Sequence, residues 1–148
     1  MSSDRITAAQ RREVIARAQQ HCEYCYSRMD FSAQSFSVEH IIPRDKGGTN
    51  ALDNLALACQ GCNNFKHVKV EAFDAVSNEV VSLFHPRRQD WCEHFAWNDD
   101  YTIVLGISSI GRSTVQLLKL NRIGVINLRR ALFLMGEHPP IKTIRSTE

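Results

Sequence analysis

Between Val38 and His67 the sequence groups side chains that can bind metal ions or accept protons. Glu39 and His40 are adjacent, and Asn63 follows in a cysteine-rich segment. A hard divalent ion such as Mg²⁺ prefers oxygen ligands, which the Glu39 carboxylate and the Asn63 amide can supply. A neutral His40 can accept a proton from water near neutral pH. These residue types suit a site that combines a divalent ion with a proton acceptor.

Four of the five cysteines form two Cys-x-x-Cys pairs, Cys22/Cys25 and Cys59/Cys62. Brought together, two such pairs supply four thiolates in the tetrahedral arrangement that structural zinc accepts. The alternative is a redox motif, but it needs a thioredoxin-like strand-to-helix context that the sequence lacks. We therefore predict a structural zinc ion held by all four residues, and a free thiol at Cys92.

The elements around these residues can be read from local patterns. Thr7 to Gln10 has the form of a capping box, which predicts a first helix over about residues 8–20. Its arginines either form a solvated face or touch phosphate. Residues 36–40 alternate as a short strand, the segment with Pro43 and Gly47-Gly48 breaks into a loop, and residues 51–59 read as a second antiparallel strand.

A second helix is predicted after these strands. Residues 60–76 carry Phe65, Val68 and Phe73 at helical offsets. On a helix beginning near Cys62, Asn63 and His67 are four residues apart and lie on one face. The order is thus strand, loop, strand, helix.

The overall composition limits the class of protein. Of the 148 residues, 43% are hydrophobic and 23% are charged, which is ordinary for a soluble globular chain. No apolar run is long enough to span a membrane, and the N-terminus lacks the apolar core of a signal peptide. We expect a cytoplasmic protein. The net charge of +2 is too small to indicate nucleic-acid binding by itself.

The ordered motifs closely resemble the HNH endonuclease family. The resemblance is carried by "EHIIP" at residues 39–43, "GGTNALDNLALAC" at residues 47–59 and "CNNFKH" at residues 62–67. It indicates the branch in which two cysteine knuckles bind zinc around a nuclease finger of two strands, a metal ion and a helix. Since these short elements bury little apolar surface, the zinc would fasten the finger to the preceding segment.

The resemblance implies a role for each matching residue. His40 matches the first His of the motif and would be the general base, and Glu39 matches the acidic metal ligand before it. Asn54 matches the central Asn, and its amide would hold the loop that aims His40. Asn63 matches the last position, which binds the metal ion.

The ligand set departs from family members that have His at the last position. Because Asn63 offers oxygen, Mg²⁺ or Mn²⁺ is the expected catalytic ion. His67 lies where the nuclease colicins place a further metal-binding His, so contact with metal or phosphate and an exposed polar role both stay open. Asn64 replaces Asn63 if the helix starts one residue later.

Basic side chains near the predicted site are candidates for contact with nucleic-acid phosphates. They are Arg44 and Lys46 in the loop and Lys66 and Lys69 on the helix, while Arg87 and Arg88 further along the chain belong to a second candidate surface. Arginine beside an aromatic residue such as Trp91 suits nucleic acid. A Trp packed in a second core, with the arginines solvated, is the alternative.

We predict an α+β fold: a small ββα-metal core stapled by the four-cysteine zinc, an N-terminal helix, and a C-terminal α/β extension packed on it. Residues 1–76 would form the nuclease domain. Residues 77–148 would be a dependent extension that contacts DNA, dimerises or docks, with Trp91, Phe95 and Trp97 in a small core. Its last helix places Arg129 beside an apolar face that is either core or a dimer contact.

Together these features predict a metal-dependent endonuclease that hydrolyses DNA and nicks one strand per monomer. Double-stranded DNA is the expected substrate, RNA stays open, and no membrane partner is expected. Cutting both strands would need a homodimer or two visits. The alternatives are a catalytically idle zinc-knuckle module that binds nucleic acid, and a nuclease subunit of a larger defence or repair complex.

Overall fold

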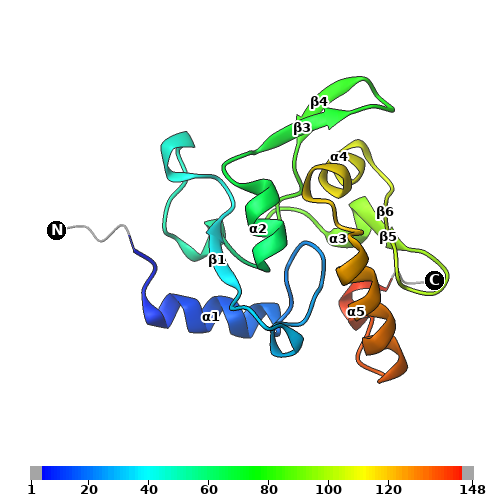
Figure 1. The fold of residues 1–148 in the computed structure, drawn as a ribbon. Helices are drawn as coiled ribbons and strands as arrows, with labels where there is room; N and C mark the ends of the chain where they lie inside the picture. Colours follow the sequence, from blue (N-terminus) through cyan, green and yellow to red (C-terminus); the bar gives the residue numbers. More distant parts are fainter. Residues whose placement is uncertain (1–4, 145–148) are drawn as a thin grey trace. The chain divides into compact units, whose positions relative to one another are not determined.

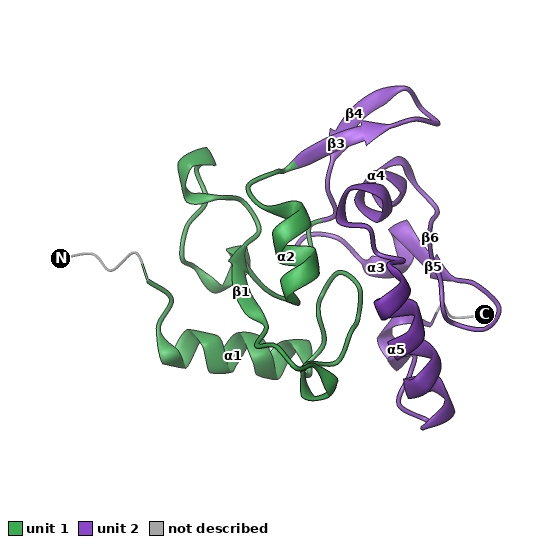
Figure 2. Ribbon diagram, in the orientation of Figure 1, with its two compact units in different colours: residues 1–70, 85–87 green, residues 71–84, 88–148 purple. Residues whose placement is uncertain are grey.

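The structure is a computed structural model that describes residues 5–144, and the chain divides into two compact units (Figures 1 and 2). Unit 1 consists of residues 1–70 and 85–87, and unit 2 of residues 71–84 and 88–148. The fold is α+β, as predicted, with an N-terminal helix, small hairpins and C-terminal helices. No helix within the described range is long and apolar enough to cross a bilayer.

Unit 1 contains the predicted order of strand, loop, strand and helix. Its elements are α1 (Ala8–Ala18), β1 (Ser37–His40), β2 (Leu55–Ala58) and α2 (Gln60–Lys66), with short 3₁₀ turns at Met29–Phe31, Arg44–Lys46 and Leu52–Asn54. The two strands pair antiparallel. Every residue of β2 is buried, so this strand forms the centre of the unit.

Helix α1 begins at the capping box read from the sequence. The Gln10 backbone N–H donates to the Thr7 hydroxyl at 3.0 Å, and the Thr7 N–H donates to the Gln10 side chain at 2.9 Å. The helix ends at Ala18, because Gln19 takes a left-handed conformation. Its buried residues, Val14 and Ala18, lie on the side that packs against β2.

The second helix is shorter than predicted. Helix α2 ends at Lys66, and His67 has a φ of 49°. Residues 71–74, expected to continue the helix, form β3 (Glu71–Asp74), which pairs with β4 (Glu79–Ser82). The turn between them is stabilised by Asp74, whose carboxylate accepts from the Ser77 N–H at 3.0 Å. This Asx-type turn outweighs the helical spacing of the apolar residues.

Unit 2 also contains α3 (Trp91–His94), β5 (Phe95–Trp97), β6 (Val104–Gly106), α4 (Ser109–Leu118), α5 (Ile123–Leu134) and a 3₁₀ turn at Ile141–Thr143. The aromatic core suggested by the sequence is present. The rings of Trp91 and Phe95 are 5.2 Å apart, and those of Trp91 and Trp97 are 5.3 Å apart. Phe84 contacts Phe95 edge to face at 5.1 Å.

Arg129 on α5 differs from the expected position beside an apolar face. It is only 1% exposed, and its guanidinium donates to the carbonyls of Thr102 at 2.8 Å and Leu120 at 2.7 Å. It also lies 5.1 Å from the centre of the Trp97 ring. A buried arginine with these partners ties α5 to two preceding loops.

An ion pair links the β3–β4 hairpin to α4. The Asp74 carboxylate accepts two hydrogen bonds from the Arg112 guanidinium, at 3.0 and 2.9 Å. The hydrogen bonds from Arg112, and then that from Ser77, hold the pKa of Asp74 well below its usual range. Since the unfolded carboxyl has a pKa of about 3.9, this pair stabilises the fold above that pH and loses its effect as the pH falls.

We therefore expect Asp74→Asn to lower the midpoint of thermal unfolding at pH 7, with a difference from the wild type that shrinks as the pH falls below about 4. Circular dichroism melts at pH 7 and pH 3 test this. Asp99→Asn is the matched control, because it removes the same charge from an exposed position. An equal loss at both pH values would contradict the expectation.

Candidate functional site

The four paired cysteines form one buried cluster in unit 1. Their sulfur atoms all lie within 4.8 Å of one another, and the cysteines are not joined by disulfides. Zinc–sulfur bonds of about 2.3 Å set the edge of a tetrahedral site at about 3.8 Å. The Cys25 and Cys59 sulfurs are 3.7 Å apart. The cluster therefore fits a structural zinc ion, as predicted.

The first cysteine knuckle is also tied to β2 by Glu23. The Glu23 N–H donates to the Leu57 carbonyl at 2.9 Å, and the Glu23 carboxylate accepts from the Leu57 N–H at 2.8 Å. The same carboxylate pairs with Arg87. Burial lowers the pKa of Arg87 to about 10, so its guanidinium still carries a charge at neutral pH.

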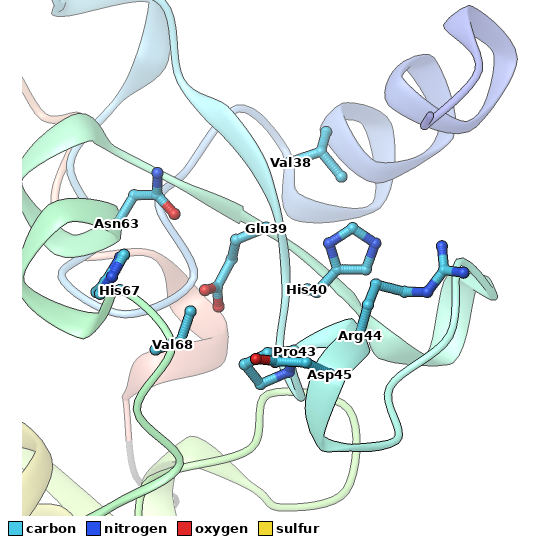
Figure 3. A pocket seen from close by; sticks show the side chains of 9 residues that line it. All are labelled: Val38, Glu39, His40, Pro43, Arg44, Asp45, Asn63, His67 and Val68. Carbon is cyan, nitrogen blue, oxygen red and sulfur yellow. The ribbon is translucent and has the colours of Figure 1, made fainter. Parts of the chain in front are cut away.

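Strand β1 presents Glu39 and His40 to a surface pocket. Glu39 lies opposite Ala56 and His40 opposite Leu55 in the antiparallel register. The pocket has a volume of about 500 Å³, and its lining residues include Glu39, His40 and Asn63. In Figure 3 the Glu39 and Asn63 side chains lie on one side of β1 and His40 on the other, as strand alternation requires.

Two donors from different elements hold the Glu39 carboxylate. The hydroxyl of Tyr24, from the first knuckle, donates to Glu39 Oε1. Lys66 Nζ, from α2, is 3.2 Å from Glu39 Oε2 and donates to the Ile41 carbonyl at 2.8 Å. Burial raises the pKa of Glu39, and the Lys66 charge opposes that shift. Burial also raises the pKa of Tyr24 well above its usual range, so the hydroxyl keeps its proton.

Lys66 therefore does not occupy the position expected of a phosphate contact. A phosphate contact must reach solvent, but Lys66 is only 2% exposed and its charge is directed at Glu39. Lys66 lies in the last turn of α2, and its side chain reaches from there to the Glu39 carboxylate of β1. A buried charge of this kind needs a partner, and Glu39 is that partner.

His40 is oriented by a contact from the loop. Its Nε2 lies 2.7 Å from Asn50 Oδ1, and the Asn50 carbonyl accepts from the Gln10 side chain at 2.8 Å. When Nε2 carries the ring proton and donates it to Asn50, Nδ1 is the nitrogen left to accept a proton. Gln10, the third residue of α1, thus supports the loop residue that contacts His40.

Asn54 holds the two ends of that loop together. Its side chain accepts from the Ile42 N–H at 2.9 Å and donates to the carbonyls of Ile42 and Thr49, both at 2.9 Å. Gly48 is required in this closure, because a Cβ there would lie 1.7 Å from the Ile42 carbonyl oxygen. These contacts fix the start of the loop directly after His40.

Helix α2 sets the remaining candidate ligands. It begins after Cys59, whose sulfur accepts from the Cys62 N–H at 3.4 Å. Asn63 and His67 both line the pocket, whereas Asn64 is exposed and is not part of the lining. The helix start therefore favours Asn63 over Asn64 as the pocket-facing amide. Oxygen atoms from Glu39 and Asn63 in one pocket suit a hard divalent ion.

The other predicted phosphate contacts differ in exposure. Arg44, Lys46 and Lys69 are exposed, and Arg44 lines the pocket. Lys46 Nζ donates to the Val68 carbonyl at 2.8 Å, which links the loop to the end of α2. Arg88 is exposed in unit 2, whereas Arg87 is half-buried against Glu23 in unit 1.

The sequence analysis did not identify Tyr24 or Asn50 as parts of the site. Tyr24 lies between two cysteines, where a buried aromatic residue is ordinary, and Asn50 follows a Gly-Gly turn, where Asn is common. Their contacts with Glu39 and His40 form only when the first knuckle and the loop fold against β1. The arrangement places the imidazole of His40 and the side chains of Glu39 and Asn63 around one open pocket.

We expect Lys66→Met to lower the free energy of unfolding by about 3 to 5 kcal/mol, because it leaves the Glu39 carboxylate buried without its opposite charge. Glu39→Gln together with Lys66→Met should lose less than the sum of the two single changes. Urea unfolding of the zinc-loaded protein at pH 7, followed by circular dichroism, gives the three values.

Lys69→Met is the control for this cycle, because Lys69 is an exposed lysine close to Lys66 in the chain. It should change the free energy of unfolding by no more than about 0.5 kcal/mol. Strictly additive effects of the Glu39 and Lys66 changes would show that the two charges do not interact.

Part of the chain matches a known protein family. Residues 22–69 match the family model described as HNH endonuclease. No curated protein and no solved structure matches the chain. The matched segment contains both cysteine pairs, β1, β2 and α2. The resemblance predicted from the motifs is confirmed over residues 22–69, which match the HNH endonuclease family.

Proposed function

We propose that this protein is a metal-dependent endonuclease that hydrolyses phosphodiester bonds in DNA. The family implies a nucleic-acid substrate. The observation that carries the proposal is that Glu39, His40 and Asn63 all line one pocket. A binding module without activity would not need a proton acceptor beside two oxygen ligands, so this set favours an enzyme over the idle zinc-knuckle alternative.

His40 acts as the general base in this proposal. It accepts a proton from a water molecule whose oxygen attacks phosphorus, while the bond to the leaving 3′ oxygen breaks. Asn50 holds the ring by one nitrogen and leaves the other for the water. Asn54 has no part in proton transfer, and its bonds to Ile42 and Thr49 keep the loop closed behind His40.

Glu39 and Asn63 would hold a divalent ion, for which Mg²⁺ or Mn²⁺ is our choice because both donors are oxygen atoms. When bound, such an ion supplies positive charge to the phosphate and the leaving oxygen. His67 lies on the same pocket and contacts either that ion or a phosphate. The exposed Arg44, Lys46 and Lys69 are the proposed contacts with the nucleic-acid backbone.

The four cysteines hold zinc for structure, since all four are protein ligands and leave no open coordination position. We place the protein in the cytoplasm, where thiols stay reduced. One site per chain cuts one strand, and a double-strand cut needs a homodimer or a larger complex. Residues 77–148 are proposed as the extension that contacts DNA, dimerises or docks. The exposed Arg88 is its candidate contact with nucleic acid, because the Arg87 guanidinium is engaged by Glu23.

Supercoiled plasmid incubated with Mg²⁺ or Mn²⁺ should be converted to open circles by the wild type. We expect His40→Ala to slow this nicking by about 10²- to 10⁴-fold, which is the usual contribution of a general base. Gel electrophoresis over time measures the rates. Nicking by His40→Ala at the wild-type rate would rule out the proposed mechanism.

Two neighbouring amides provide the matched control in the same assay. Asn63→Ala removes a pocket-lining side chain and should reduce nicking at limiting Mg²⁺. Asn64→Ala makes the same chemical change on the exposed side of α2 and should leave the rate unchanged. Equal rates for the two variants would remove Asn63 from the proposed ion site.

Elemental analysis should find about one zinc ion per chain, because a single four-cysteine cluster is formed. Cys62→Ser removes one ligand and should lose both the zinc and the folded state of unit 1. Cys92→Ser is the control. Because Cys92 lies outside the cluster, this variant should keep its zinc and its fold. A folded wild-type protein without zinc would contradict the assignment.

A further inference from the structure

Tyr24 occupies a position between the cysteine cluster and the pocket. It lies between Cys22 and Cys25 in the chain, and it is only 1% exposed. Its hydroxyl donates to Glu39 Oε1. One residue of the first knuckle thus reaches the carboxylate proposed to hold a divalent ion.

The backbone around Tyr24 is fixed on both sides. The Cys22 N–H donates to the Ser27 carbonyl at 2.8 Å, which closes the knuckle. Glu23 pairs with the Leu57 backbone through both its N–H and its carboxylate. The Tyr24 ring therefore has a fixed point of attachment relative to the β1–β2 hairpin that carries Glu39.

Each carboxylate oxygen of Glu39 contacts a different residue. Tyr24 donates to Oε1, and Lys66 Nζ lies 3.2 Å from Oε2. A carboxylate has two acceptor directions on each oxygen, so one donor on each oxygen fixes its plane and leaves acceptor capacity for a cation. Groups that orient a metal ligand in this way control affinity without touching the ion.

We propose that Tyr24 is a positioning residue that transmits the order of the cysteine knuckle to the Glu39 carboxylate. The affinity of the pocket for a divalent ion then depends on the knuckle through a single hydroxyl group. This inference rests on the proposed function, because it takes Glu39 as a ligand of the catalytic ion.

The test compares two tyrosines of the same knuckle. Tyr24→Phe removes only the oxygen that contacts Glu39, and Tyr26→Phe makes the same change where the ring packs against His21. Calorimetric titration of the zinc-loaded full chain with Mn²⁺ gives the Kd. We expect Tyr24→Phe to weaken Mn²⁺ binding by about 10- to 100-fold with zinc content unchanged, and Tyr26→Phe to leave the Kd unchanged.

Glu39→Gln separates failure of this inference from failure of the proposed function. If Glu39→Gln binds Mn²⁺ with the same Kd as the wild type, Glu39 is not a ligand and the proposed site is wrong. If Glu39→Gln loses binding but Tyr24→Phe binds as the wild type does, only the role of Tyr24 is overturned.

If Tyr24→Phe does not retain zinc, a second measurement can be made on the protein with Tyr24 in place. The chain contains three tyrosines, Tyr24, Tyr26 and Tyr101. Labelling with 3-fluorotyrosine gives three fluorine signals, which Tyr26→Phe and Tyr101→Phe assign by elimination. Mg²⁺ should shift the Tyr24 signal and leave that of Tyr101 unmoved. A Tyr24 signal that does not respond to Mg²⁺ would overturn the proposal.

Discussion

The buried carboxylate of Glu39 is the group around which the candidate site of unit 1 is organised. An ionised carboxylate removed from water is stable only where donors and an opposite charge replace its hydration. Tyr24 and Lys66 provide these, one from the first knuckle and one from α2. Both elements must therefore be held against β1 before the pocket has its shape, and the contacts of Glu23 with β2 serve that end.

The cysteine cluster explains how so small a unit can hold those elements. Its ligands come from the segment after α1 and from the start of α2, and Cys59 both belongs to the cluster and accepts from the first turn of the helix. Two four-residue strands and a helix of two turns bury little apolar surface. A zinc ion bound at this junction would limit the freedom of the segments that carry Tyr24 and Asn63.

Sequence reasoning succeeded where a local pattern has a local cause. The capping box at Thr7 follows from residues near one another in the chain, and each Cys-x-x-Cys pair is a local pattern whose spacing indicated the four-cysteine cluster. It failed where a partner distant in the chain decides the outcome. The Lys66 side chain is buried because Glu39 needs an opposite charge. The Arg129 side chain is buried because carbonyl groups of two loops accept hydrogen bonds from it. The β3–β4 hairpin replaced a predicted helical continuation because the Asx-type turn at Asp74 competes with apolar spacing.

Residues 85–87 belong to unit 1 although residues 71–84 before them belong to unit 2. This limits how unit 1 can be isolated as a fragment. A fragment that stops at Val70 keeps every cysteine of the cluster and every residue lining the pocket, yet it lacks the guanidinium that pairs with Glu23. The Glu23 carboxylate would then be left near β2 with its negative charge uncompensated. A minimal version of unit 1 thus needs either the short returning peptide supplied in trans or a neutral side chain in place of Glu23.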